Sequence, residues 1–217
     1  AQLQAAGVET FVGDDDASAR CPDAVFPNNW VTLHPDGTVV LYPMLAPCRR
    51  RERRLDLVAM LERRGGFRVE RLLDLTHFEA AGEFLEGTGS LVFDHVRRIA
   101  YAALSPRTHL APLRELCAEL GYEPCVFAAA DATGAAIYHT NVMLAIGSSF
   151  AVVAAECITS ERRAEVLGRL HDSGRDVIEI DAAAMAAFAG NVLELRSTAG
   201  PRVLAMSQSA ATSFGAA

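Results

Sequence analysis

YHTNVMLAIGSSFAVVAAE, residues 138–156, contains the pattern that the rest of the chain repeats. It predicts two apolar strands, at 142–146 and 150–154, joined by a Gly147-Ser148-Ser149 turn. Near-continuous apolar runs broken by a Gly-Ser turn are typical of strands buried on both faces. His139 stands directly before the first strand. The ring is either a hydrogen-bonded structural group or a general acid–base, and its position alone favours the structural role.

The same order of elements returns along the chain. After this hairpin we predict a helix at 160–172, which Ser160 caps at its start, and a strand at 176–180. One earlier copy has strands at 30–33, 38–42 and 67–73 and a helix at 49–64. The next has strands at 90–93, 99–103 and 124–127 and a helix at 107–120, and a fourth begins with strands at 192–195 and 203–206. A period of roughly 50–60 residues is typical of propellers and solenoids.

In each copy, a polar side chain lies directly before the first strand. These residues are Asn28 and Asn29, Glu86, His139 and Asn191. If the repeats surround a pseudo-symmetry axis, equivalent positions converge on that axis. Polar side chains gathered at one end of buried strands form a site rather than a core, so this pattern is the first functional signal.

Composition limits the possible partners and location. The chain has 217 residues, 51% of them hydrophobic and 22% charged, and a net charge of −7. This charge argues against nucleic acid or an anionic membrane as the main partner. The five cysteines show neither metal-ligand spacing nor a small disulfide framework, which predicts a cytoplasmic protein without a metal or other cofactor. The basic run RRRERR at 49–54 is expected to be the solvated first turn of a helix.

Several ordered motifs carry a family resemblance. PDAVFPNNW, LYPM and RRRER are followed by LEGTGSLVFD, SPRTH, YHTNVMLAIGSS and AGNVLEL. Together they resemble the guanidine-modifying (pentein) superfamily, which includes dimethylarginine dimethylaminohydrolases, arginine deiminases and amidinotransferases. The similarity is greatest to the amidinotransferase-like group associated with citrulline use. It implies an α/β propeller of ββαβ repeats, formed here by a single domain over residues 1–217.

The resemblance also implies a chemistry and its residues. In this family a cysteine thiolate attacks the central carbon of a guanidinium or ureido group, while a histidine acts as acid–base. His139 matches the catalytic histidine and Glu86 the acid of the Leu-Glu-Gly motif. The positions where relatives contact the substrate are Asp23, Asn28, Asn29 and Asn141, and those that hold its α-carboxylate are Arg50 and Arg107.

Two departures from the family pattern affect this expectation. Asn141 stands where deiminases have an acid two residues after the histidine, and asparagines replace acids near residue 28. Fewer negative charges favour a citrulline-like ureido substrate. The nucleophile of the family lies in the last repeat, and none of the five cysteines is a convincing replacement. We therefore expect about three full repeats with partial first and last parts, truncated at both ends, and an inactive, self-associating fragment.

Three functions stay open on these grounds. The first is a hydrolase of the C–N bond in a guanidino or ureido amino acid, whose only partner is that small molecule, apart from a possible homo-oligomer. The second is an amidinotransferase that passes the group to an amine. The third is a non-catalytic binding protein of the same architecture, as in a ribosome anti-association factor.

Overall fold

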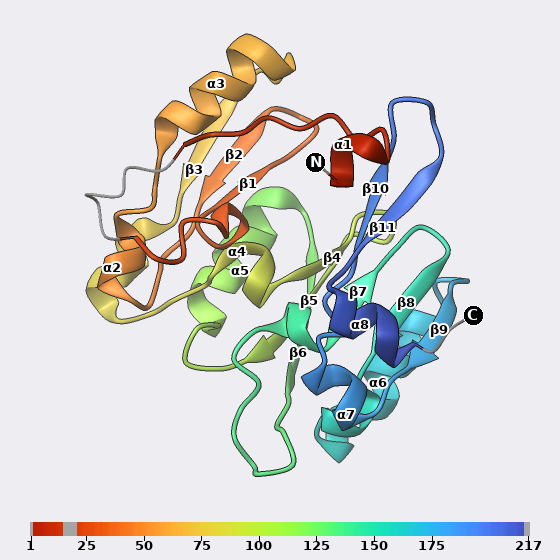
Figure 1. The fold of residues 1–217 in the computed structure, drawn as a ribbon. Helices are drawn as coiled ribbons and strands as arrows, with labels where there is room; N and C mark the ends of the chain where they lie inside the picture. Colours follow the sequence, from red (N-terminus) through yellow and green to blue (C-terminus); the bar gives the residue numbers. More distant parts are fainter. Residues whose placement is uncertain (1, 15–20, 215–217) are drawn as a thin grey trace.

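The computed structural model describes residues 2–14 and 21–214, and three copies of the predicted ββαβ unit form three separate sheets (Figure 1). Their strands are β1 (Val31–Leu33), β2 (Thr38–Leu41) and β3 (Arg71–Asp74), then β4 (Val92–Asp94), β5 (Ile99–Leu104) and β6 (Glu123–Ala128), then β7 (Leu144–Ile146), β8 (Phe150–Val153) and β9 (Asp176–Glu179). In each sheet the first two strands pair antiparallel and the last two parallel, so the second strand lies in the middle. The predicted strand order is confirmed.

The longest helix between the second and third strands of each copy is α3 (Leu55–Gly65), α5 (Leu110–Leu120) or α6 (Ser160–His171). α5 shows why these segments are helical. Its buried residues include Leu113, Leu116 and Leu120, which follow a spacing of three and four residues. Three buried leucines contribute about 1.5–3 kcal/mol each, whereas an isolated helix of this length is marginal. The helix ends at Gly121, whose φ of 68° is the left-handed conformation of a C-cap.

The prediction of one continuous helix at 49–64 is wrong, because the structure has two helices there. α2 (Pro47–Arg50) and α3 are separated by residues 51–54. Arg49 and Glu52, each 3% exposed, form a buried ion pair rather than a solvated turn. The turn that buries this pair interrupts the helix. The strand predicted from residue 67 likewise begins only at Arg71.

A fourth copy is represented by the hairpin of β10 (Leu193–Arg196) and β11 (Arg202–Ala205), followed by α8 (Gln208–Ser213). A short helix that the sequence reasoning missed, α7 (Ala182–Ala186), precedes it, and the Asp181 side chain caps its start. The hairpin meets the other end of the chain near α1 (Gln2–Ala5), where Thr198 N–H donates to the carbonyl of Gly7 at 2.8 Å (Figure 1).

Two hydrophobic clusters join successive sheets. One contains Tyr42 and Leu75 of the first copy with Leu113 of the second. The other contains Tyr101 of the second copy with Val152 of the third. Each copy therefore packs on its neighbour in chain order. The fold is mixed α/β, and its arrangement as propeller blades stays a prediction. Among the described residues, no helix has the length and apolar character needed to cross a bilayer.

A one-turn helix precedes the first strand of each sheet: η2 (Pro27–Asn29), α4 (Gly87–Ser90) and η4 (Thr140–Val142). These turns delay the strands relative to the predicted starts at 30, 90 and 142. α4 packs against both η2 and η4. The residues that precede the strands in three repeats are thereby brought together.

Candidate active site

Two glycines allow α4 to approach its neighbours closely. Gly87 has a φ of 45°, and a Cβ at this position would lie 2.1 Å from the carbonyl oxygen of Asn28. A Cβ at Gly89 would lie 2.6 Å from Nδ2 of Asn29 and 2.7 Å from Cε1 of His139. Any larger residue would collide with both side chains. The Gly-Thr-Gly sequence is thus the reason that η2, α4 and η4 meet.

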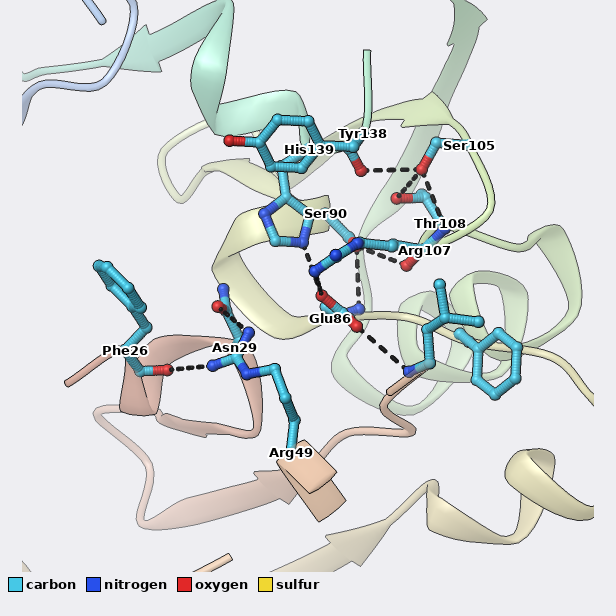
Figure 2. A network of polar contacts seen from close by, with 12 residues as sticks. Phe26, Asn29, Arg49, Glu86, Ser90, Ser105, Arg107, Thr108, Tyr138 and His139 are labelled. Atoms are coloured by element: carbon cyan, nitrogen blue, oxygen red, sulfur yellow. Dashed lines mark hydrogen bonds and ion pairs between the residues drawn. The ribbon is translucent and has the colours of Figure 1, made fainter. Parts of the chain in front are cut away.

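Glu86, the N-cap residue of α4, is a fully buried carboxylate with three donors. Leu45 N–H donates to Oε1 at 3.1 Å. Arg107 Nη1 donates to Oε2 at 3.1 Å, and His139 Nε2 lies 2.8 Å from the same oxygen (Figure 2). Burial alone would raise the pKa of Glu86, but the hydrogen bond from His139 and the charge of Arg107 hold it below its ordinary value. Glu86 is therefore ionised at neutral pH.

His139 is 7% exposed and lies at the start of η4. An ionised carboxylate can only accept hydrogen bonds, so Nε2 carries the proton that is shared with Glu86. In the neutral ring, Nδ1 then has the lone pair. A Cβ on Gly89 would lie 2.8 Å from Nδ1, so this nitrogen and the Asn29 amide border the space that the glycine leaves. The expected approach of Glu86 and His139, 53 residues apart in sequence, is confirmed.

Arg107 and Tyr138 form the solvent-facing side of this pair. The side chain of Arg107 is 33% exposed, and its guanidinium carbon lies 5.6 Å from the centre of the Tyr138 ring. Tyr138 is 45% exposed, and its ring centre lies 5.0 Å from that of His139 (Figure 2). An arginine and an aromatic ring thus separate the buried carboxylate from solvent.

A second buried network, missed by the sequence reasoning, holds Asn29. Arg49 Nη1 donates to Oδ1 of Asn29 at 2.8 Å, and Nη2 lies 3.4 Å from the carbonyl of Phe26 (Figure 2). The same guanidinium also contacts Glu52 and the carbonyl of Asp23. Asn29 therefore has a fixed orientation, with its amide nitrogen towards Gly89. Asp23 itself lies outside the pair, with a half-exposed carboxylate 3.8 Å from Nε of Arg49.

Arg50 is not brought to Glu86 and His139. Its Nε donates to the carbonyl of Met44 at 2.9 Å and its Nη2 to that of Leu45 at 3.3 Å, and it also pairs with Glu79. Arg50 thus supports the loop whose Leu45 N–H reaches Glu86. Of the two arginines expected to hold a carboxylate, only Arg107 lies at the pair.

The remaining asparagines line a cleft of about 580 Å³. Asn28, Asn141 and Asn191 belong to it, together with residues of β4, β7 and β10. Asn28 Nδ2 donates to Thr88 Oγ1 at 3.1 Å, and Asn191 Nδ2 donates to the carbonyl of Asn141 at 3.1 Å. Polar residues from four repeats therefore converge, as their positions before the strands predicted. Three asparagines line the cleft, and Asn29, Glu86 and His139 lie around Gly89.

The cysteines lie elsewhere. Cys117, Cys125 and Cys157 belong to the hydrophobic clusters. Burial raises the pKa of Cys117 and of Cys125 to about 11 and also raises that of Cys157. Cys21 Sγ contacts the carbonyl of Cys48 at 3.9 Å, on the side of Arg49. No cluster of three or more histidine, cysteine or acidic side chains suited to a metal occurs within residues 2–14 and 21–214.

Comparison with known protein families shows which family the chain belongs to. A family profile described as N,N dimethylarginine dimethylhydrolase, eukaryotic, matches residues 1–217. The chain belongs to this family. The guanidine-modifying superfamily that the motifs resemble is thereby confirmed. A search of curated proteins finds no match.

Solved structures share the fold of this dimethylhydrolase family member. Apo ArgZ, an arginine dihydrolase from the ornithine–ammonia cycle in cyanobacteria, is 18% identical with a TM-score of 0.68 over 89% of this chain. Unliganded AgrE is 19% identical with a TM-score of 0.68 over 88%. A cysteine-to-serine mutant of the dimethylarginine hydrolase DDAH from Pseudomonas aeruginosa, in complex with citrulline, is 20% identical with a TM-score of 0.53 over 80%. The chain spans only 28%, 26% and 59% of these three proteins.

The sequence contained a signal for the close packing of α4, which the sequence reasoning did not use. Gly87 and Gly89 alternate with Thr88 in a segment that otherwise reads as the entry to a strand, and such a pattern indicates close backbone approach. The buried Arg49 and Glu52 gave no such signal, since a run of charged residues is usually solvated.

Proposed function

We propose that this protein hydrolyses a C–N bond of a guanidino or ureido amino acid, with Glu86 binding the planar N–H groups and His139 transferring protons. The observation that carries the proposal is the buried Glu86 carboxylate between His139 and Arg107. A buried charge of this kind is expensive unless it is paired, and such groups are concentrated at functional sites. Membership of the dimethylarginine dimethylhydrolase family supports the same substrate class.

Glu86 already binds a guanidinium, that of Arg107. A guanidinium offers donors in a planar fork that matches a carboxylate. Arg107 makes this one side-chain hydrogen bond and is one-third exposed, so it can leave at low cost. The substrate guanidinium takes its place on Oε2, and the displaced Arg107 turns to the α-carboxylate of the substrate. Asn28 and Asn141 then contact the substrate from the cleft.

The chemistry has two steps. A thiolate attacks the central carbon, and the leaving amine departs with a proton supplied by His139. With a guanidino substrate, water then attacks the resulting thiouronium carbon and gives a proton to His139, and collapse of this adduct expels the thiolate and releases a ureido product. A ureido substrate passes through a thiocarbamate in the same two steps and releases a carbamate. General acid–base catalysis of this type contributes about 10²–10⁴-fold to a rate.

The thiolate is the component that the chain does not offer near Glu86. Cys117, Cys125 and Cys157 are core residues with raised pKa values, and such thiols are poor nucleophiles. Cys21 and Cys48 lie beside Arg49, beyond Asn29. The nucleophile in this proposal therefore comes from outside these 217 residues, and the 217-residue chain alone has no hydrolase activity.

The test is turnover by the full-length protein. L-arginine, NG,NG-dimethyl-L-arginine and L-citrulline are supplied, and release of amine, ammonia, citrulline and ornithine is measured with and without glycine as an acceptor. Glu86→Gln and His139→Asn are each expected to lower kcat by about 10²–10⁴-fold. A guanidino group found on glycine would indicate the transferase instead.

Two matched variants serve as controls. Asp94 is, like Glu86, a fully buried carboxylate paired with an arginine, and His34 is a buried histidine bonded to Thr32. Asp94→Asn and His34→Asn are expected to reduce stability and leave kcat close to that of the wild type. If the substrates bind but none of them is turned over, the result would support the non-catalytic binding protein and reject the hydrolase.

A further inference from the structure

Two hydroxyl groups, of Ser90 and Thr140, lie next to Glu86 and His139. Neither Ser90 nor Thr140 has any exposed surface. Ser90 Oγ accepts a hydrogen bond from Glu86 N–H at 2.9 Å and donates to the carbonyl of Arg107 at 2.8 Å (Figure 2). A single hydroxyl thus contacts the backbone of two of the three residues in the charged group. Glu86 N–H also reaches the carbonyl of Arg107 at 3.2 Å, which strengthens this junction.

Thr140, the neighbour of His139, continues the connection. Its Oγ1 donates to the carbonyl of Ser90 at 2.6 Å and accepts from Ala103 N–H at 2.8 Å. The bonds form a continuous chain from Ala103 in β5 through Thr140 in η4 to Ser90 in α4. From Ser90 the chain continues to the backbone of Glu86 and of Arg107. The Ser90 hydroxyl therefore bonds the backbone of Glu86 and Arg107, and the Thr140 hydroxyl ties the residue next to His139 to Ser90.

The direction of these bonds is fixed by chemistry. A hydroxyl has one proton to donate, and the backbone N–H groups of Glu86 and Ala103 can only donate. Each hydroxyl therefore accepts from one N–H and donates to one carbonyl, so the direction of both bonds is specified. A buried hydrogen-bond chain that is fully satisfied favours one geometry, and removing a member leaves a buried group unpaired.

The strands next to these two hydroxyls have interactions of their own. The strand pairs of β4–β5 and β7–β8 are held by their own backbone hydrogen bonds and by the two hydrophobic clusters. What the hydroxyl chain does fix is the position of α4 relative to η4, and hence the distance between the carboxylate and the imidazole. Catalysis is sensitive to that distance, because a misplacement of about 1 Å can cost about 10²-fold in rate.

We propose that Ser90 and Thr140 are positioning residues, whose hydroxyls set the Glu86–His139 geometry for proton transfer. This inference rests on the proposed hydrolase function. Neither side chain touches the reacting atoms, so their effect is on kcat through the two residues that they hold.

The experiment compares variants that differ only in the hydroxyl, made in the full-length protein. Thr140→Val keeps the shape and removes the hydroxyl, whereas Thr140→Ser keeps the hydroxyl, and Ser90→Ala tests the other member. Thr140→Val and Ser90→Ala are expected to lower kcat about 10- to 100-fold with KM little changed. Thr140→Ser is expected to restore most of the rate. Equal rates in Thr140→Val and Thr140→Ser would overturn the proposal.

Thr32→Val is the matched control. Thr32 Oγ1 also has two partners, His34 Nε2 at 3.0 Å and the Tyr42 hydroxyl at 2.8 Å, but these lie away from Glu86. We expect Thr32→Val to lower the melting temperature as much as Thr140→Val does and to leave kcat unchanged. A parallel loss of kcat in this control would show that stability, rather than positioning, is being measured.

A second readout separates this proposal from the hydrolase proposal, because it needs no substrate. The proton on Nε2 of His139 is hydrogen-bonded to Glu86 and should give a protected NMR resonance in the wild type. It should broaden or vanish in Thr140→Val and persist in Thr32→Val. Wild-type protein without turnover would then reject the hydrolase alone, whereas an unchanged resonance in Thr140→Val would reject the positioning role.

Discussion

Glu86 combines complete burial with three hydrogen-bond donors, two of them on basic side chains. This combination explains why its pKa lies below the ordinary value of 4.5 despite desolvation. A carboxyl group whose folded pKa is depressed stabilises the fold above its unfolded pKa. That contribution is lost as the pH falls through the folded pKa.

Stability of the wild type should therefore depend on pH through Glu86 in a way that Glu86→Gln does not. We expect the difference in free energy of unfolding between the two proteins to be constant above about pH 4.5 and to shift against the wild type at lower pH. Urea denaturation from pH 3 to pH 7 measures it, and the other carboxyl groups cancel because both proteins contain them. A difference that is independent of pH would contradict the pairing.

Gly89 offers a test of close packing at the site. Gly89→Ala would place a methyl group 2.6 Å from Nδ2 of Asn29 and 2.7 Å from Cε1 of His139, closer than side chains tolerate. We expect turnover to fall by about 10²-fold or more, because both side chains must move. Gly168→Ala is the control, since its Cβ would meet no atom within 4 Å and α6 is helical there. Full activity of Gly89→Ala would contradict this geometry.

Some of the site residues could be predicted from the sequence, and others could not. Glu86 and His139 were found from their places before successive strands, and Arg107 from a family motif. Arg49 and Glu52 were misread as solvated, because only the tertiary fold supplies Asn29 and the loop carbonyls that satisfy the buried arginine. Arg50 was placed at the site although it bonds to Met44 and Leu45 instead.

The one-turn helices η2, α4 and η4 are the elements that create the site. The sequence reasoning began the strands at 30, 90 and 142, at or directly after the last residue of each turn, and predicted no helical turn before them. The Thr-Gly-Ser segment has no periodicity long enough to distinguish a single helical turn from a strand. Strand order was predictable because apolar runs, turns and helices repeat, whereas the short turns depend on contacts between repeats.

The repeats are also joined by charge. Arg175, before β9, donates to both oxygens of the fully buried Asp94, at the end of β4, at 2.7 and 3.1 Å. Arg175→Met would leave this carboxylate unpaired, so we expect a loss of about 3–5 kcal/mol in the free energy of unfolding. Arg202→Met, which removes an exposed partner of Glu194, should cost less than about 1 kcal/mol. Chemical denaturation compares them, and equal losses would contradict a structural role for the buried pair.

For the molecule as a whole, the first residues of the chain meet the β10–β11 hairpin (Figure 1). The β10–β11 hairpin pairs with no further strand among residues 2–14 and 21–214, and Leu193 and Leu204 are exposed on it. A two-stranded hairpin is marginal alone. The bonds from Thr198 to Gly7 therefore help to hold it in position, together with the bonds from Ser148 to Glu194 of β10.

Removal of residues 1–7 should loosen this hairpin selectively. We expect faster amide hydrogen exchange in β10 and β11, while β5, the central strand of its sheet, keeps its protection. Hydrogen exchange followed by mass spectrometry measures both segments in one sample. Uniformly faster exchange would indicate general destabilisation, and unchanged exchange in the hairpin would contradict its dependence on the first residues.

The central claim is that Glu86 binds the guanidino or ureido group beside His139, in the place that Arg107 occupies in the free protein. Its most direct test is an NMR titration of full-length protein, labelled at histidine and arginine nitrogens, with L-arginine, NG,NG-dimethyl-L-arginine and L-citrulline. We predict saturable shifts of the His139 Nε2 and Arg107 guanidinium resonances as the ligand replaces Arg107 on Glu86, while Arg169, paired with Glu123 outside the cleft, does not respond. Saturable binding that leaves His139 and Arg107 unshifted for all three ligands would contradict the account.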